Sequence, residues 1–263
     1  MMNPGGRVFL EQKDEFCHRN NFRGVDLNRN ADWAYNGPGS SKVPGHEEYY
    51  FFNLARIDRL FEADECSNCV RNNGEHAWSE PESQFFRDLA LANKYLAYLS
   101  IHSGEQQIFS AFVDSFSKKN KRLRPNTTSE LAMIKQMQDN SAGFYSRSGV
   151  GWKMNSYSAD GTLYDWIAGV VEVPYSICGE VWGRPYHPDC FNMFNPKSEN
   201  LLADLRKIRP IYTQFFIYLA EKHLGNKYVL PPASSSLQFE SFRALCENEK
   251  RLESRLLRQN LLN

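Results

Sequence analysis

The sequence of 263 residues predicts an α/β domain with a mixed, largely parallel sheet flanked by helices. Two apolar runs, residues 95–101 and 170–178, support this prediction. Short apolar runs bounded by polar residues are typical of strands that are buried on both faces. Segments with helical periodicity lie before, between and after the two runs, and such alternation favours a sheet covered by helices on both sides.

The first half of the chain opens with a turn-rich segment up to about residue 41, with many Asn, Arg, Asp and Gly residues. Apolar residues that recur near the helical period predict a helix over residues 47–61. The run Ser79-Glu80-Pro81-Glu82 predicts the start of another helix, which should continue to about residue 93. Ser79 is the expected cap, and proline suits the first helical turn.

The second half contains a predicted helix near residues 129–137 and a stretch rich in Gly, Ser and Tyr over 143–161. Pro174 is expected at the entry of the second strand, where a missing N–H is tolerated. A long helix over about 199–224 should be kinked or split at Pro210. The residues of this helix expected to pack on the sheet are Leu202, Leu205, Ile208, Tyr212, Phe215, Phe216 and Leu219.

The end of the chain differs in composition from the rest. Pro231-Pro232 and the serines that follow predict a linker, and the residues from 237 to 262 predict an amphipathic, charge-rich helix. The predicted organisation is therefore one domain over residues 1–228, followed by a linker and a C-terminal helix over 229–263.

The charge balance argues against nonspecific nucleic-acid binding. Lys+Arg and Asp+Glu are both 31, so the chain has no excess of cations to displace counterions from a nucleic acid. The basic run over residues 118–124 is interpreted as a solvated loop. No apolar run approaches the ~20 residues needed to span a bilayer, and no signal peptide is visible.

The six cysteines include one close pair, Cys66 and Cys69, with His76 nearby. This pair could be half of a zinc site, or it could be two ordinary cysteines in a loop. A strong signal for structural zinc needs a second pair at matching spacing, and the sequence has none.

Polar residues follow both predicted strands. His102 follows the first apolar run, and Glu180 follows the second. Ligands of open α/β sheets bind just beyond the carboxyl ends of strands, so the two side chains could hold a metal and a proton acceptor over one crevice. The alternatives are a histidine with a structural role at the strand end and a glutamate that only marks the polar exit of the strand.

Two further segments have residues suited to ligand binding. The segment over residues 24–30, with Arg29 beside Asn28, could clamp a carboxylate or could form a structural Asn/Asp turn. The segment over residues 155–162, which contains Tyr157, could be a mobile flap that presents a phenol or an ordinary surface loop. The chain has no G-x-S-x-G nucleophile elbow and no glycine-rich nucleotide motif.

Taken in order, these segments resemble the zinc carboxypeptidase family. The segment Val25-Asp26-Leu27-Asn28-Arg29-Asn30 matches a motif of that family closely. The other matching landmarks, with Gly5 in place of Asp and Gly179 in place of an aromatic residue, are Asn3-Pro4-Gly5-Gly6, Gly37-Pro38-Gly39-Ser40-Ser41, Ser79-Glu80-Pro81-Glu82, Ile101-His102-Ser103 and Ser176-Ile177-Cys178-Gly179-Glu180. The resemblance covers residues 3–224 and implies a zinc-exopeptidase-like fold that is truncated at its N-terminus.

The resemblance implies a metallocarboxypeptidase that removes C-terminal amino acids from peptides or proteins by attack of a metal-activated water. His102 would be a zinc ligand, and one zinc ion is expected in the complete domain. Zinc lowers the pKa of its bound water to around 7 and polarises the peptide carbonyl. Glu180 would take the proton of this water, and Arg19 would stabilise the oxyanion.

The same resemblance implies how a peptide C-terminus, the expected partner, would be bound. Asn28 and Arg29 would hold the terminal carboxylate, and Tyr157 corresponds to the mobile tyrosine of the family. Tyr164 corresponds to the floor of the specificity pocket. Because a tyrosine is uncharged there, a neutral or aromatic C-terminal residue is favoured.

One departure from the family concerns the zinc ligands. The first two ligands of the family come from a His-x-x-Glu motif, and the only such motif in this sequence is His102-Ser103-Gly104-Glu105, inside the segment of the third ligand. Catalytic zinc normally takes three protein ligands, so this chain alone is expected to bind zinc weakly and to hydrolyse little. The alternatives are an inactive relative that still binds peptide C-termini and an interaction scaffold that uses the C-terminal helix.

Overall fold

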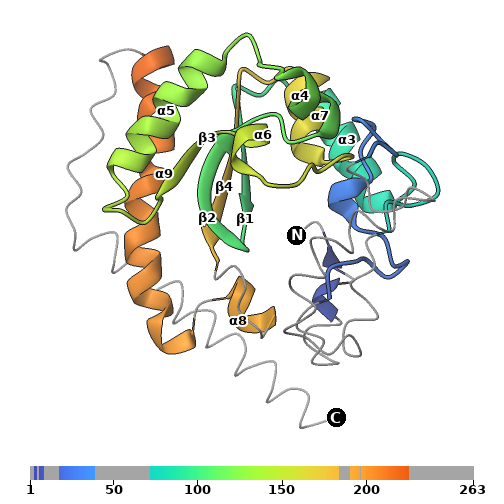
Figure 1. The fold of residues 1–263 in the computed structure, drawn as a ribbon, viewed down its shortest axis with the longest axis horizontal. Helices are drawn as coiled ribbons and strands as arrows, with labels where there is room; N and C mark the ends of the chain where they lie inside the picture. Colours follow the sequence, from blue (N-terminus) through green and yellow to red (C-terminus); the bar gives the residue numbers. More distant parts are fainter. Residues whose placement is uncertain are drawn as a thin grey trace, which may run out of the picture. The chain divides into compact units, whose positions relative to one another are not determined.

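The computed structural model describes residues 3–4, 6–8, 18–38, 72–183, 190–195 and 197–224 (Figure 1). The chain divides into two compact units, Met1–Tyr218 and Leu219–Asn263. The helix predicted over 47–61, the Cys66 and Cys69 pair and the helix predicted over 237–262 lie outside the described residues. The predicted domain boundary at residue 228 also lies there and stays a prediction.

The described residues form a four-stranded mixed sheet in the order β1-β4-β2-β3. Strand β1 is parallel to β4, and β2 is parallel to β3, whereas β2 and β4 are antiparallel. The predicted mixed, largely parallel sheet is therefore confirmed. The strands are β1 (Ala97–His102), β2 (Glu105–Ser110), β3 (Arg147–Val150) and β4 (Tyr175–Trp182).

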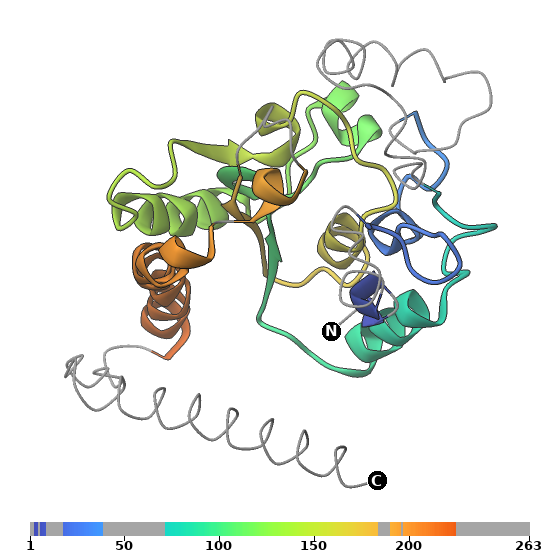
Figure 2. The same ribbon diagram turned by 90° about the horizontal axis from the view of Figure 1, so that it is seen from below.

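Helices cover both faces of this sheet. Figures 1 and 2 show α5 and α9 on one face and α3 and α7 on the other. None of the helices in the described ranges is long and apolar enough to cross a membrane. The helices whose bounds lie within the described ranges are η1 (Leu27–Arg29), α3 (Pro81–Ala92), α4 (Ser115–Asn120), α5 (Thr127–Asp139), α6 (Gly151–Met154), α7 (Leu163–Gly169), α8 (Cys190–Phe194), η2 (Ser198–Asn200) and α9 (Leu201–Leu224).

The helices predicted near 81–93 and 129–137 are confirmed as α3 and α5, but the predicted cap of α3 is wrong. The N-cap residue is Glu80, which makes no capping bond with its side chain, and Pro81 is the first helical residue. The Ser79 hydroxyl instead donates to Glu80 Oε1 at 2.8 Å and accepts from Asn30 Nδ2 at 2.9 Å. Ser79 therefore links α3 to the segment that contains Asn30.

The first predicted strand is confirmed as β1, but its predicted burial on both faces is wrong, because Ile101 is 59% exposed. The second strand is misplaced in the prediction. Val170 is the C-cap residue of α7, and Glu172 has a left-handed backbone with φ of 57°. The strand begins only at Tyr175, just after Pro174, and it continues through Glu180 to Trp182. The predicted run therefore contains the end of α7 and the start of β4. Val173 lies between these two elements and is apolar because it is a buried core residue.

The long predicted helix is confirmed as α9, which contains Pro210 and is not split by it. The predicted buried face is wrong in part. Leu202 and Phe216 are 66% and 63% exposed, whereas Ile211 and Phe215 are 0% and 4% exposed. Apolar residues occur around most of this helix, so periodicity alone does not select the side that meets the sheet.

Gly179 explains how α9 approaches the sheet closely. A Cβ atom at this position would lie 2.2 Å from the Tyr212 hydroxyl oxygen. This hydroxyl lies 2.8 Å from the hydroxyl of Tyr145, which follows α5. Because Gly179 has no side chain, Tyr212 from α9 occupies the space that a Cβ atom would fill.

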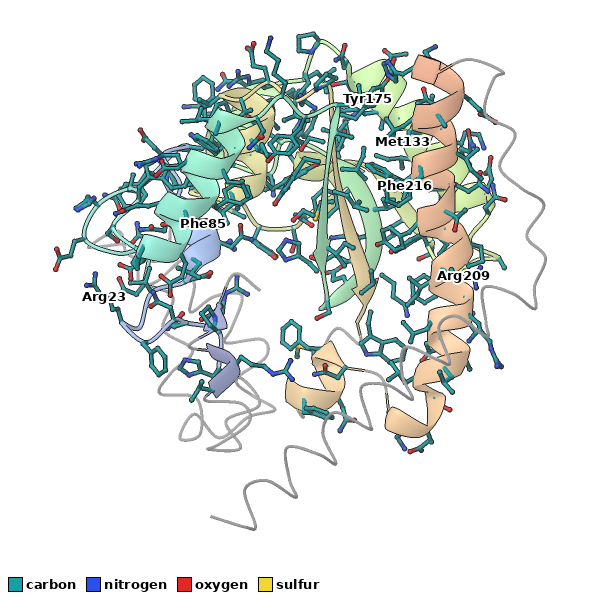
Figure 3. The ribbon with its side chains drawn as sticks, turned by 180° about the vertical axis from the view of Figure 1, so that it is seen from behind. Arg23, Phe85, Met133, Tyr175, Arg209 and Phe216 are labelled. Carbon is teal, nitrogen blue, oxygen red and sulfur yellow. The ribbon has the colours of Figure 1, made fainter. Side chains whose placement is uncertain are left out.

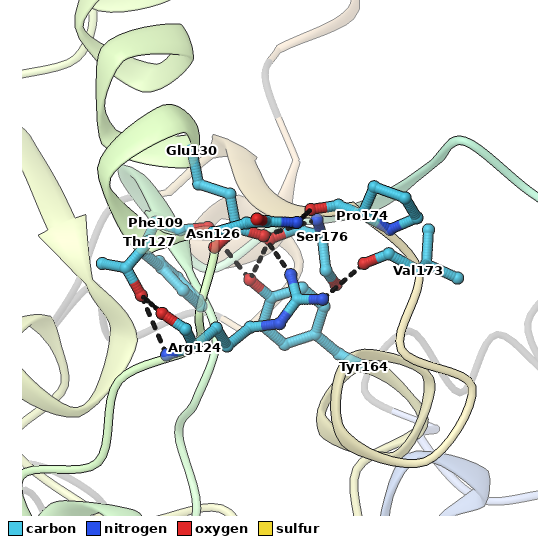
Figure 4. A network of polar contacts seen from close by, with 9 residues as sticks. All are labelled: Phe109, Arg124, Asn126, Thr127, Glu130, Tyr164, Val173, Pro174 and Ser176. Carbon is cyan, nitrogen blue, oxygen red and sulfur yellow. Dashed lines mark hydrogen bonds and ion pairs between the residues drawn. The ribbon is translucent and has the colours of Figure 1, made fainter.

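The basic run over residues 118–124 is exposed over residues 119–123, as the sequence predicts, but it is not a loop throughout and it is buried at its end. Lys118 lies in α4, and Arg124 is buried in a network that Figure 4 shows. Arg124 donates to the Glu130 carboxylate and to the Val173 carbonyl, and Glu130 also accepts from the Ser176 backbone N–H at 2.8 Å. This network ties the start of α5 to the start of β4.

Candidate functional site

The candidate site is centred on two residues at the carboxyl ends of β1 and β4. His102 is the last residue of β1 and lies directly opposite Glu180 in the parallel register of the two strands. Directly opposed residues of neighbouring strands extend from the same face of a sheet. The structure therefore brings together the two strand-end residues that the sequence singled out.

The imidazole of His102 is held through one of its ring nitrogens. Its Nε2 atom lies 2.8 Å from the Ser100 hydroxyl, so Nδ1 is the ring nitrogen that this contact leaves for another ligand. Burial, together with the positive charges of Arg19 and Arg29, lowers the pKa of His102 from its ordinary value of 6.5 to about 4. The ring is therefore neutral at neutral pH, as metal ligation requires.

The pKa of the Glu180 carboxyl group is raised, whereas that of His102 is lowered. Burial raises the pKa of Glu180 to about 7, the nearby Glu105 carboxylate adds to this effect, and Arg19 opposes it. The Oε2 atom of Glu180 is buried and has no hydrogen-bond partner among the described residues. A carboxylate that titrates near neutral pH has the property of a general base.

The Arg19 guanidinium contributes charge to both residues. Its Nε donates to Asp26 Oδ2 at 2.5 Å, and its side chain is 40% exposed. Partial burial alone would lower the pKa of Arg19, but the Asp26 carboxylate, with smaller contributions from Tyr157 and Glu180, raises it. Arg19 therefore lies within electrostatic range of Tyr157 as well as of His102 and Glu180.

Asn28 and Arg29 belong to the short helix η1, which Asp26 caps by accepting a hydrogen bond from Asn28 N at 3.0 Å. The Arg29 side chain is buried, and one of its terminal nitrogens donates to the Asn28 carbonyl at 2.7 Å. The Asn28 side-chain oxygen accepts from Leu163 N at 3.2 Å, at the start of α7. These contacts fix η1 against α7.

The close packing of η1 on the following loop depends on one glycine. Gly161 has φ of 75°, in the left-handed region that favours glycine, and a Cβ atom there would lie 2.3 Å from the Arg29 carbonyl oxygen. Its backbone exchanges hydrogen bonds with Ala31 and Trp33 at 3.0 and 2.8 Å. The segment that carries Tyr157 is thereby joined to the segment that carries Arg29.

Tyr164 does not lie with these residues. It is 3% exposed and packs in a core cluster with Phe109 and Cys178. Its hydroxyl donates toward the backbone carbonyls of Phe109 and Ser176, at 3.1 and 2.9 Å. A phenol that is buried and bonded in this way is not presented to a substrate, so the position of Tyr164 gives no support to its predicted role in substrate binding.

The donor set for a metal is incomplete in the described part of the chain. Catalytic zinc sites take three protein ligands, but the ranges that the structure describes contain no group of three His, Cys, Asp or Glu side chains that could hold a metal ion. His102 suits a single ligand position, and nothing in the described ranges completes the site.

Two polar residues beside the site have only weak signals in the sequence. Ser100 precedes His102 by two positions, and alternate residues of a strand face the same side, so the period of the strand could have identified it. Gln107 lies on β2 directly opposite Glu180, and only the strand pairing reveals this neighbour.

Replacing Glu180 with glutamine should stabilise the chain by about 2–3 kcal/mol at pH 8 and have little effect at pH 4.5. The folded-state pKa of Glu180 is raised to about 7 from 4.5, so the stability that the protonated group contributes is lost as the pH rises between these values. Urea denaturation of both proteins at several pH values measures the difference. A stability difference that does not change with pH would contradict this expectation.

Comparisons with known proteins agree with this fold. The sequence profile described as zinc carboxypeptidase matches residues 1–209. The structure of bovine thrombin-activatable fibrinolysis inhibitor in complex with tick carboxypeptidase inhibitor is similar, with a TM-score of 0.60 and 18% identity over 84% of this chain and 68% of that chain. Carboxypeptidase A from Helicoverpa armigera gives a TM-score of 0.59 and 17% identity over 85% of this chain and 51% of that chain. Curated protein sequences give no match.

These two likenesses show the fold, and the chain spans 68% and 51% of the two structures. The family profile carries more weight, because it covers most of the chain and includes η1, β1 and β4. The chain belongs to the zinc carboxypeptidase family.

Proposed function

We propose that this chain carries the substrate-binding part of a zinc-dependent carboxypeptidase, together with its general base and one of its zinc ligands. The observation that supports this best is the register of β1 and β4, in which His102 stands opposite Glu180. The charges of Arg19 and Arg29 act on His102, so both guanidinium groups lie near this pair. A neutral imidazole, a carboxyl group that titrates near neutral pH and two cations are groups that zinc-assisted hydrolysis of a C-terminal peptide bond would use.

The substrate in this proposal is a peptide or protein with a free C-terminal carboxylate. Arg29 and Asn28 would bind this carboxylate, because a guanidinium can hold a carboxylate through two parallel hydrogen bonds. The burial of Arg29 strengthens such a contact, since charges interact more strongly away from water. A requirement for the terminal carboxylate would make the cleavage exopeptidic.

Glu180 would act as the proton acceptor for the attacking water. Above about pH 7 the carboxylate is ionised, takes a proton from the water and passes it to the leaving amine. Arg19, which lies within electrostatic range of Glu180, would donate hydrogen bonds to the oxyanion that forms on the carbonyl oxygen.

Zinc belongs to the proposal through the family, which is zinc-dependent in general. A zinc ion supplies Lewis acidity and lowers the pKa of a bound water. His102 would be a ligand through Nδ1, with Ser100 orienting the ring through Nε2. Since the described residues do not contain three suitable ligands together, the roles above are assigned to Glu180, Arg19 and Arg29 without the metal.

A second function is favoured by this incomplete ligand set. A chain that binds zinc weakly could still recognise peptide C-termini through Arg29, Asn28 and Arg19 without cleaving them. The sequence supports this alternative, because the family takes its first two zinc ligands from a His-x-x-Glu motif. The only such motif in this sequence starts at His102, which corresponds to the third ligand. Peptide binding is common to both functions, and turnover separates them.

The test uses the full chain and N-benzoyl-glycyl-phenylalanine, with the amide of the same peptide as the matched control. We expect calorimetry to show that the carboxylate form binds about tenfold or more tightly than the amide, because only the carboxylate can pair with Arg29. Equal affinity for the two peptides would reject both functions. Release of phenylalanine in the presence of zinc would favour the enzyme, and binding without release would favour the recognition function.

A further inference from the structure

The segment that carries Tyr157 is attached to the rest of the unit at its downstream end. The Ala159 N–H donates to the Val113 carbonyl at 3.0 Å. The buried Asp160 carboxylate accepts from the backbone N–H and from the hydroxyl of Ser115, at 2.6 and 2.7 Å. This end of the segment is therefore fixed to the start of α4.

The upstream end is held by side chains from two other elements. The Gln107 amide, on β2, donates to Asn155 Oδ1 at 2.7 Å. The Lys118 ammonium, on α4, donates to the Asn155 and Ser156 carbonyls at 3.0 and 2.7 Å. Only residues 157 and 158 remain between the two attached ends, so the structure does not present Tyr157 on a long, free flap.

The positively charged ammonium of Lys118 binds backbone carbonyl groups. Its ammonium points at two backbone carbonyls, and in the described ranges it forms no ion pair with a carboxylate. Partial burial lowers the pKa of Lys118, so the group gives up hydration to make these contacts. A lysine held in this way fixes the positions of the two carbonyls that immediately precede Tyr157.

Gln107 connects the same segment to the candidate site. It is 2% exposed and lies directly opposite Glu180 in the antiparallel register of β2 and β4. Glu180 in turn lies opposite His102, so the three residues form one row across the sheet. The amide of Gln107 therefore joins this row to Asn155, which lies two positions before Tyr157.

We propose that Gln107 and Lys118 are positioning residues, which hold the Tyr157 segment beside Arg19 before a peptide binds. The anchoring is a property of the free chain, whereas its effect on peptide affinity rests on the proposed function. A segment that is already ordered does not have to be ordered by the ligand, so the anchors should increase peptide affinity. Neither residue has to touch the peptide for this effect.

The test measures hydrogen exchange of the full chain by mass spectrometry, for the segment 155–160. Gln107→Leu, which keeps the size of the side chain but cannot donate, and Lys118→Met should each accelerate exchange of this segment about tenfold. The conservative variant Lys118→Arg, which can still donate, should exchange within about twofold of the wild type. Lys119→Met, at the exposed neighbouring position, is the matched control and should also leave the segment unchanged.

The same variants should bind N-benzoyl-glycyl-phenylalanine about three- to tenfold more weakly than the wild type, again with recovery in Lys118→Arg. Unchanged exchange in both Gln107→Leu and Lys118→Met would overturn the anchoring. Faster exchange with full peptide affinity would overturn the positioning role.

If Gln107→Leu does not fold, Asn155→Ala removes the same hydrogen bond from the loop side and gives the same test. A wild-type chain that binds no peptide would reject the proposed function, while the exchange rates would still decide the anchoring.

Discussion

Replacing Arg124 with methionine should destabilise the folded chain by about 3–5 kcal/mol at pH 8. The side chains of Arg124 and Glu130 are 4% and 0% exposed, so the substitution leaves a buried carboxylate without its cation. Burial already raises the pKa of Glu130, and Arg124 opposes this shift. The loss should therefore be smaller at pH 5, where Glu130 can take up a proton.

Urea denaturation at both pH values measures this effect. The double variant Arg124→Met with Glu130→Leu is the matched control, because it removes the whole pair and leaves no buried charge. It should recover much of the lost stability, although the Ser176 N–H and the Val173 carbonyl lose their partners (Figure 4). A loss below about 1 kcal/mol in the single variant would show that the pair is not buried as described.

Replacing Arg29 with methionine should weaken binding of N-benzoyl-glycyl-phenylalanine about 30- to 100-fold. Methionine fills a similar volume but cannot donate hydrogen bonds to a carboxylate. The affinity for the peptide amide should change little, and this comparison separates the loss of a charge contact from a general disturbance of the site. Calorimetry with both peptides measures the two effects.

Arg23→Met is the matched control for Arg29. Arg23 belongs to the same segment, but its side chain is exposed at the surface (Figure 3). Net charge changes equally in both variants, so a long-range electrostatic effect would appear in both. Similar peptide affinities in the two variants would contradict the assignment of Arg29 to the terminal carboxylate.

The sequence predicted the elements that have a short apolar run or a clear helical period of apolar residues. Strand β1 and helices α3 and α5 belong to this group. Strand β2 was missed because Glu105, Gln106 and Gln107 open it with three polar residues. Two of these, Glu105 and Gln107, alternate along the strand and lie near Glu180, so the polar chemistry of the site hides the strand signal.

Helix α9 and strand β4 show a different limit of sequence patterns. Apolar residues of α9 that contact the sheet could not be told from those that face outward, because Ile211, Phe215 and Phe216 are equally apolar. The apolar run over residues 170–178 extends across the end of α7 and the start of β4, so it does not show where the helix ends and the strand begins. Tertiary packing decides both cases, and hydrophobicity along the chain does not record it.

The site itself was predictable only where one short segment carries the chemistry. His102 is the last residue of β1 and Glu180 lies two residues before the end of β4, whereas Asn28 and Arg29 belong to one short motif. Gln107 and Lys118 contact residues 48 and 37 positions away, so no local pattern identifies them. Tyr164 matched its family landmark in sequence, but its hydroxyl is bound to two strands in the core.

The central claim is that His102, Glu180, Arg19 and Arg29 form one site. The most direct test is an NMR titration of the His102 imidazole in the full chain, with its resonance assigned by its loss in His102→Gln. We expect this ring to titrate with a pKa of about 4, well below its ordinary value of 6.5, because it is partly buried and lies near Arg19 and Arg29. Removing one cation in Arg19→Met should raise this pKa. A pKa near 6.5 that is the same in the wild type and in the variant would contradict the account, since the imidazole would then be neither buried nor close to the arginine.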